Sequence, residues 1–247
     1  MSTAILIPNY NMPERTEALC ENIVRRVEGD YSIIVVDNAS DLKPPASTTA
    51  VHLEKNIQTT GAWLKGLEYA KSLKKKFDYY WFVITSAEFD DADYDPLAPM
   101  LEFMDANPGA VGIHPSLTTD STTSWKQLIT RGGNIPRRTW MIDNIASLYR
   151  ADWFDSIGWF DPRFIYAWGI DLETCFLARQ QQRSIWVDER IKMKKITNIG
   201  YSMNRMNMSA DDRSRLAGEN MRLVMREKYG PRWEQAIFES NVRPEWK

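Results

Sequence analysis

Polar side chains that can do chemistry follow three short apolar segments in the first ninety residues. Residues 8–11 (Pro-Asn-Tyr-Asn) follow the first segment, residues 37–38 (Asp-Asn) the second, and residues 85–88 (Thr-Ser-Ala-Glu) the third. Carboxylates and amides bind the hydroxyl and imide groups of ligands, and carboxylates also bind divalent cations. Ligands of open α/β sheets bind at the carboxyl ends of the strands, so we expect these groups to line one edge.

A second acidic pair, Asp171 and Glu173, lies where a helix over residues 172–182 is predicted to begin. The helix dipole keeps a carboxylate at this end ionised, which suits a general base. Asp171 also fits a plain helix N-cap, so both interpretations remain open. Trp140, Asp143 and Trp168 precede this pair. Tryptophan faces stack on sugar rings, but they also fill protein cores.

Strand-like and helix-like segments alternate through the first half, which predicts right-handed βαβ units and a mainly parallel sheet. Asn11 is expected to cap the first helix, with Pro13 in its first turn, and Pro96 to open the third. The expected strands cover residues 4–8, 32–36, 51–53, 79–84 and 110–113. Apolar residues at helical spacing mark three helices: Leu19, Ile23 and Val27; Trp63, Leu67 and Ala70; Leu97, Leu101 and Met104.

The second half is less regular. Residues 118–139 are polar and are expected to form a long loop or a small hairpin. Further strands are expected at residues 145–149, 185–187 and 191–196. Ser209 and Asp212 form a capping box for a C-terminal helix, which Gly230 and Pro231 should end.

The composition narrows the functional classes. A net charge of -2 gives no general attraction to nucleic acid, which we do not expect as a partner. No apolar run is long enough to span a bilayer, and the N-terminus lacks the features of a signal peptide. Cys20 and Cys175 suggest no disulfide framework, so we expect a cytoplasmic protein that visits a membrane only peripherally. The glycine motifs of dinucleotide-binding and P-loop enzymes are absent.

Five segments carry a more specific resemblance. Residues 4–11 (AILIPNYN) resemble the opening IPxYN of family 2 glycosyltransferases, and residues 33–41 (IIVVDNASD) resemble their VVDNxSxD segment. Asn56, followed by Gly61 and Gly66, is similar to their NxG…G pattern. Residues 158–164 (GWFDPRF) resemble GxFDxxF, and residues 169–173 (GIDLE) stand where the family has EDxD. The resemblance covers about residues 4–200, and the five motifs occur in the expected order.

This resemblance implies a GT-A fold over residues 1–205, with a nucleotide-binding half (1–115) and an acceptor-binding half (116–205), followed by a helical extension (206–247). It implies inverting transfer of a sugar from a UDP-, dTDP- or GDP-type donor to a hydroxyl of a glycan or lipid-linked acceptor. Asp171 would be the base, and Glu173 the alternative base or an orienting partner. Acceptor contacts are expected from Trp140, Asp143 and Trp168. Donor contacts are expected from Pro8, Tyr10, Asn11, Asp37, Asn56, Ser86, Glu88, Lys194 and Lys195.

The sequence departs from the family where the family binds a metal ion. Residues 86–88 (Ser-Ala-Glu) replace the acidic DxD-like pair, and no histidine follows the last expected strand. Two alternatives follow. In the first, Glu88 holds Mn2+ or Mg2+, with nearby Asp90, Asp91 and Asp93 as substitutes. In the second, cationic side chains replace the metal ion at the diphosphate. The candidate cations are Lys194, Lys195 and Arg205. His52 and His114 are expected to be structural.

Two rival functions remain. The first is a catalytically silent GT-A-like protein that binds a nucleotide or a glycan, an idea that the eroded metal motif favours. The second is a nucleotidyltransferase, which the missing glycine-rich, basic first loop disfavours. The sequence leaves the oligomeric state open, and an oligomer is compatible with it.

Overall fold

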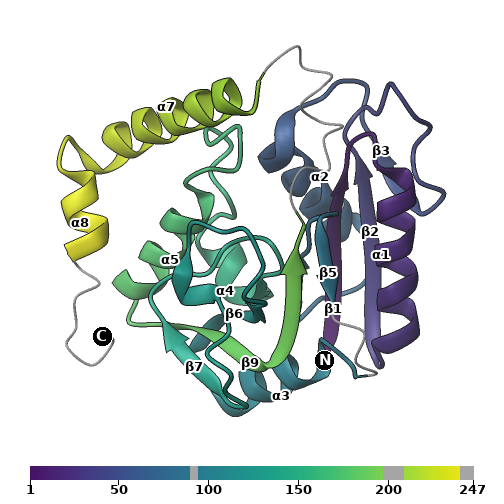
Figure 1. The fold of residues 1–247 in the computed structure, drawn as a ribbon, viewed down its shortest axis with the longest axis horizontal. Helices are drawn as coiled ribbons and strands as arrows, with labels where there is room; N and C mark the ends of the chain where they lie inside the picture. The colour runs from purple at the N-terminus through teal and green to yellow at the C-terminus, as the bar shows by residue number, and fades with distance from the viewer. Residues whose placement is uncertain (90–93, 197–208, 240–247) are drawn as a thin grey trace.

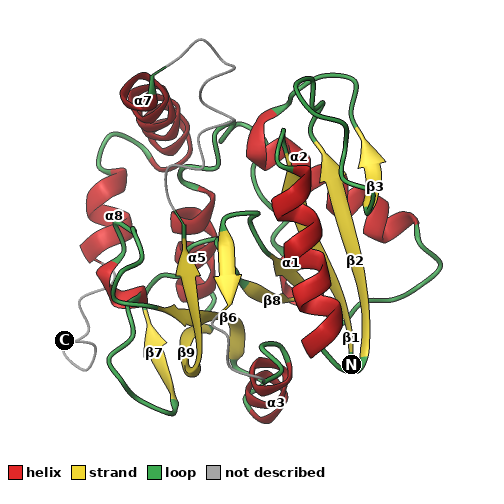
Figure 2. Ribbon diagram, turned by 45° about the vertical axis from the view of Figure 1, so that its right-hand side comes forward, coloured by secondary structure: helices red, strands yellow, loops and turns green. Residues whose placement is uncertain are grey.

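The computed structural model describes residues 1–89, 94–196 and 209–239 (Figure 1). The first half of the chain is a parallel unit with strand order β3-β2-β1-β4. The chain moves from β1 to β2 in one direction and from β3 to β4 in the other, so right-handed connections set α1 and α2 on opposite faces (Figure 2). Its elements are β1 (Ser2–Asn9), α1 (Pro13–Arg26), β2 (Asp30–Asp37), β3 (Thr49–His52), α2 (Gln58–Ser72) and β4 (Tyr79–Phe82).

The second half extends the same sheet in the order β4-β8-β6-β9-β5, with β7 paired to β9. β8 is antiparallel to both β4 and β6, whereas β6 and β9 are parallel. The expected α/β fold, with helices flanking one sheet, is therefore confirmed. The sheet was expected to be mainly parallel, and it is parallel from β3 to β4 but mixed beyond β4. Its elements are β5 (Ala87–Phe89), α3 (Ala98–Ala106), β6 (Ala110–Leu117), η1 (Lys126–Leu128), β7 (Pro136–Thr139), β8 (Leu148–Arg150), α4 (Ala151–Ser156), α5 (Ile170–Gln180) and β9 (Ser184–Lys195).

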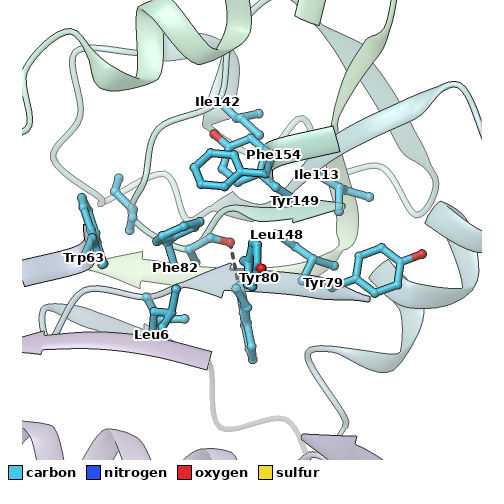
Figure 3. Close-up of a cluster of buried hydrophobic side chains, with 14 of the residues drawn as sticks. Leu6, Trp63, Tyr79, Tyr80, Phe82, Ile113, Ile142, Leu148, Tyr149 and Phe154 are labelled. Carbon is cyan, nitrogen blue, oxygen red and sulfur yellow. Dashed lines mark hydrogen bonds between the residues drawn. The ribbon is translucent and has the colours of Figure 1, made fainter. Parts of the chain in front are cut away.

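An aromatic cluster joins the two halves of the sheet (Figure 3). The ring of Phe82, on β4, lies 4.9 Å from that of Phe160 and 5.3 Å from that of Phe154. Trp63, on α2, approaches the same ring edge-on at 5.7 Å, and Tyr149, on β8, lies 6.0 Å away. All five are buried. Burying such rings stabilises a fold by about 1.5–3 kcal/mol each, so this cluster fixes α2 against the second half.

Two C-terminal helices, α7 (Ala210–Tyr229) and α8 (Trp233–Glu239), pack over the second half (Figure 1). The Ser209 hydroxyl accepts a hydrogen bond from the Asp212 N–H at 3.0 Å, and Gly230 ends α7 with φ of 80°. The capping box and the stop were both predicted. No helix in the described ranges has the length and apolarity needed to cross a membrane.

Several local predictions were wrong. Asn9, not Asn11, hydrogen-bonds to the start of α1. Its side-chain oxygen accepts hydrogen bonds from the N–H of Met12 and the hydroxyl of Thr16. Helix α3 begins at Ala98 rather than at Pro96. The side chain of Asp95 accepts hydrogen bonds from the N–H groups of Leu97 and Ala98 at its start. The two strands expected over 185–196 are one strand, β9. The short elements β5 and α4 were not predicted.

Candidate functional site

A small pocket of about 120 Å3 opens at the carboxyl ends of β1 and β2. Asn38 and Asn56 shape its floor: the Asn38 amide donates to Asn56 at 3.0 Å, and both side-chain oxygens accept backbone N–H groups at the start of α2. Residues from both strand ends and the α2 start therefore share one polar hollow. Its lining is Pro8, Asn9, Tyr10, Met12, Asn38, Asn56, Gln58, Thr59, Ile84, Thr85 and Arg213.

Asp37 lies beside this pocket but does not line it. Its carboxylate is fully buried and accepts hydrogen bonds from the Asn9 amide at 2.9 Å and from the N–H and hydroxyl of Ser40. His52 lies 2.9 Å away on its other side. Asn11, with φ of 57°, is buried too and binds the loop at residues 40–42. Both side chains are held by protein groups and shape the loops around the pocket.

A larger cavity of about 650 Å3 adjoins the small pocket, and Thr59, Ile84 and Arg213 line both. Thr60 links α2 to the loop that precedes α5, because its hydroxyl donates a hydrogen bond to the carbonyl of Phe164 and accepts one from the N–H of Ala167. The lining is Thr59, Trp63, Ile84, Ser86, Ser124, Trp125, Asp143, Asn144, Ile145, Tyr166, Ala167, Trp168, Gly169, Asp171, Leu172, Lys195, Arg213, Met221, Trp233, Glu234 and Phe238.

Two carboxylates, Asp143 and Asp171, face this cavity. Asp171 is 7% exposed, and burial together with the charge of Asp143 raises its pKa to about 7. Burial also raises the pKa of Asp143, which the nearby Lys195 ammonium counteracts. The charge of Asp143 opposes ionisation of Asp171, because a second ionisation must overcome the first charge. A carboxylate with a pKa near the working pH can act as a general base.

The start of α5 fixes Asp171. Gly169 is the N-cap, with φ of 98°, so Asp171 lies in the first helical turn and is not the cap. A Cβ on Gly169 would lie 2.6 Å from Phe164 and 2.8 Å from Met221, so only glycine fits there. The carboxylate accepts a hydrogen bond from the N–H of Leu172 at 2.9 Å.

Glu173 does not line the cavity. It is 4% exposed and accepts a hydrogen bond from the Tyr229 hydroxyl at 2.6 Å, with the Lys228 ammonium 2.5 Å away. Lys228 also contacts Asp161, at 2.8 Å. The motif residues Asp161 and Glu173 therefore anchor the end of α7 to the main body of the protein.

The four remaining predicted donor residues divide between two faces. Ser86 and Lys195 line the cavity, and Ser86 lies in the turn before β5. Lys194 and Lys195 are neighbours on β9, so their side chains point to opposite faces, and Lys194 points away from the cavity. Glu88 is exposed and pairs in register with Lys194, which forms a salt bridge with Asp120, so Glu88 lies on the same outer face.

The described residues contain no gathered set of metal ligands. Nowhere in the described ranges do three His, Cys, Asp or Glu side chains gather as ligands. His114 is buried, with Nδ1 2.5 Å from the Pro115 carbonyl, and burial lowers its pKa to about 4. The substitutes Asp90, Asp91 and Asp93, and the cation Arg205, lie outside the described residues.

Aromatic side chains form one wall of the larger cavity. Trp168 lines it and is 46% exposed, as an accessible stacking surface requires. Trp140 lies behind the wall, with its ring 5.7 Å from that of Trp125 and 5.9 Å from that of Phe238. Trp125, Trp233 and Phe238 were not predicted as site residues. They come from a polar loop and from α8, where no motif marks them.

Comparisons with known proteins rest on structure alone. No protein-family model matches the sequence, and no curated protein matches it. The fold is similar to GalNAc-T7 with UDP, GalNAc and Mn2+ (TM-score 0.66, 12% identity, 81% of this chain and 44% of that one). It is also similar to the mannosyltransferase PcManGT of Pyrobaculum calidifontis, in complex with GDP-Man and Mn2+ (TM-score 0.65, 13% identity, 96% and 68%). A third similar structure is TarS of S. aureus (TM-score 0.62, 12% identity, 97% and 43%).

These similarities show that the chain has the fold of GT-A glycosyltransferases. The chain spans less than half of GalNAc-T7 and TarS and about two thirds of PcManGT. Fold similarity alone does not fix a reaction, which has to be argued from the site.

Proposed function

We propose that this chain is an inverting glycosyltransferase that moves a sugar from a nucleotide diphosphate sugar to a hydroxyl of a glycan or lipid-linked acceptor. The observation that carries the proposal is the acid pair, half-buried Asp143 and buried Asp171, in a cavity that adjoins a polar pocket at the strand ends. GT-A relatives bound to UDP with GalNAc, or to GDP-Man, support a nucleotide-sugar donor.

In the proposed reaction, Asp171 accepts the proton of the acceptor hydroxyl. The hydroxyl oxygen attacks the anomeric carbon, and the bond from that carbon to the diphosphate oxygen breaks on the opposite face. The sugar changes its anomeric configuration, the proton stays on Asp171, and the nucleoside diphosphate leaves. The neighbouring charge of Asp143 raises the pKa of Asp171 and makes it a stronger base at neutral pH.

The donor is proposed to bind with its nucleoside in the small pocket. Tyr10 supplies an aromatic face there, and Asn38 and Asn56 supply amides for the base or ribose. Asp37 and Asn11 support the same pocket through the loop at residues 40–42. The acceptor is proposed to lie against Trp168 and Asp143, with Trp140 supporting the wall from behind.

The metal ion needs a separate test, because Mn2+ occurs with the relatives while the described residues gather no ligand group. The metal-free alternative uses cations at the leaving diphosphate. Lys195, which lines the cavity, remains a candidate, whereas Lys194 pairs with Asp120 on the outer face. No step of the proposed reaction passes through a metal ion.

Thermal unfolding tests the donor assignment. The melting temperature of the protein is measured with UDP, dTDP, GDP and CMP, each with Mn2+ and with EDTA. A ligand that binds only the folded state at 100 times its Kd stabilises it by about 2.7 kcal/mol, a shift of several degrees. One diphosphate is expected to act, and equal shifts in EDTA would favour the cation alternative. No shift with any nucleotide would contradict the proposal.

A catalytically silent binding protein is the second candidate, and it is favoured by the finding that residues 1–89, 94–196 and 209–239 gather no group of three metal ligands. It would give the same thermal shift, so turnover must separate the two. The matching diphosphate sugars are incubated with the protein, and release of the nucleoside diphosphate is followed. Binding without release or transfer to any glycan would favour the silent protein.

A further inference from the structure

One arginine joins the two cavities. Arg213 lies in the first turn of α7, in the extension that the family resemblance does not cover, and it is the only cationic residue among the described ones that lines both hollows. Thr59 and Ile84 are the uncharged residues that line both hollows with it. A ligand that spans both hollows has to pass this guanidinium.

The guanidinium has no partner among the described residues. Its Nε is buried without a hydrogen bond, and no described carboxylate forms a salt bridge with it. Burial lowers the pKa of Arg213, and the charge of the Tyr166 side chain opposes this by raising it. Arg213 is half-buried, and removing a guanidinium from water is costly unless an anion pairs with it. Arg179, the other arginine with a lowered pKa, differs because it donates to the carbonyl of Trp140.

The order of groups along the site identifies the anion. The nucleoside pocket lies on one side of Arg213, and the acids that serve the acceptor lie on the other. In a nucleotide diphosphate sugar, the diphosphate is the part between the nucleoside and the transferred sugar. Its oxygens accept the paired N–H groups of a guanidinium well, because the two geometries match.

We infer that Arg213 binds the diphosphate of the donor and carries the negative charge of the leaving group, a role for the C-terminal extension in completing the active site. The inference rests on the proposed function. It also offers a positive charge for the diphosphate that comes from the described part of the chain, where no three metal ligands gather. Arg213 comes from α7, so docking of that helix sets the position of the cation.

The test compares a diphosphate with the nucleoside that lacks it. Isothermal titration in Mn2+ measures the Kd of UDP, GDP and dTDP, and of uridine, guanosine and thymidine, for the wild type, Arg213→Gln and Arg213→Lys. For the diphosphate that binds the wild type, the Kd of the Arg213→Gln variant should be about 10- to 100-fold higher. The Kd of the corresponding nucleoside should be unchanged. Arg213→Lys should recover part of the loss. Arg215→Gln, an exposed control on the same helix, should match the wild type.

Stability separates this role from a structural one. An arginine that holds the fold together loses stability when replaced, whereas one that waits unpaired for an anion does not. The free Arg213→Gln protein should therefore melt at or above the wild-type temperature. Unchanged diphosphate affinity in this variant, or a lowered melting temperature, would overturn this inference but not the proposed function. A wild type that binds none of the diphosphates would overturn the proposed function as well.

Discussion

Asp143 and Asp171 show how residue types acquire chemistry from their surroundings. The two acids lie 28 positions apart and face one cavity, where burial and mutual repulsion raise the pKa of Asp171 to about 7. The family resemblance pointed to Asp171, and the sequence placed Asp143 nearby without indicating that the two interact. Their coupling depends on the folded path of the chain, which no local motif encodes.

The first prediction concerns pH. Asp171 works as a base only when ionised, so activity should rise with pH through a pKa near 7. Asp143→Asn removes the repelling charge, which lowers the pKa of Asp171 and moves this rise toward lower pH. The plateau should fall by about a fewfold, because the base is weaker. The pH dependence of kcat/KM checks this.

The control for this experiment is Asp30→Asn, which removes an exposed acid paired with Lys75 far from the cavity. It should leave the pH profile unchanged. An Asp143→Asn profile that rises at the same pH as the wild type would mean that the two acids do not interact.

At the level of elements, the pairing of β5 with β9 separates the predicted donor residues. Lys195 lines the cavity, whereas its neighbour Lys194 and the cross-strand partner Glu88 face away from it. The resemblance identified the right segments, but the register between these two strands determines which side chains point inward. Because β5 has only the three residues Ala-Glu-Phe, its alternating pattern is too short to predict the strand or its register from the sequence.

The second prediction concerns the start of α5. Gly169→Ala should reduce the free energy of unfolding by about 2–4 kcal/mol, through a left-handed backbone and a collision with Phe164. Urea unfolding measures this loss, and activity should fall with it because Asp171 moves. The matched control is Gly218→Ala within α7, where the nearest atom belongs to a flexible Arg222 side chain. That change should be neutral or stabilise by up to about 1 kcal/mol, and equal losses for both would contradict the account.

The third prediction concerns the anchor of α7. Lys228→Met leaves the buried Glu173 and its neighbour Asp161 without their shared ammonium, which should cost about 2–3 kcal/mol in unfolding experiments. Arg215→Gln, which removes only exposed ion pairs on the same helix, should cost less than about 0.5 kcal/mol. If Lys228→Met loses no more free energy of unfolding than the control, the contacts of Lys228 do not hold the extension.

At the scale of the whole molecule, the two predicted halves of the GT-A domain share one sheet. Residues 1–115 and 116–205 were predicted as two halves, and one continuous sheet runs through both. The alternating pattern of the first half made its parallel order predictable, because each buried strand and each helix has its own period. The irregular second half was harder, since its pairing depends on contacts distant in sequence.

The C-terminal extension was the least predictable part of the site. Its helix and caps were read correctly, but nothing in a mostly polar helix marks Arg213 as facing a cavity, or Trp233 and Phe238 as part of its wall. Such contributions appear only once α7 and α8 are docked. The activity of this protein should accordingly depend on the extension as well as on the sheet.

The central claim is that Asp171 is the base for sugar transfer, and one comparison tests it most directly. Wild type and Asp171→Asn are first shown to bind the same nucleoside diphosphate with similar affinity, and then release of that diphosphate from its sugar conjugate is measured with a glycan acceptor. The account predicts that binding persists while turnover falls at least about 100-fold. An Asp171→Asn protein that turns over at the wild-type rate would contradict the claim.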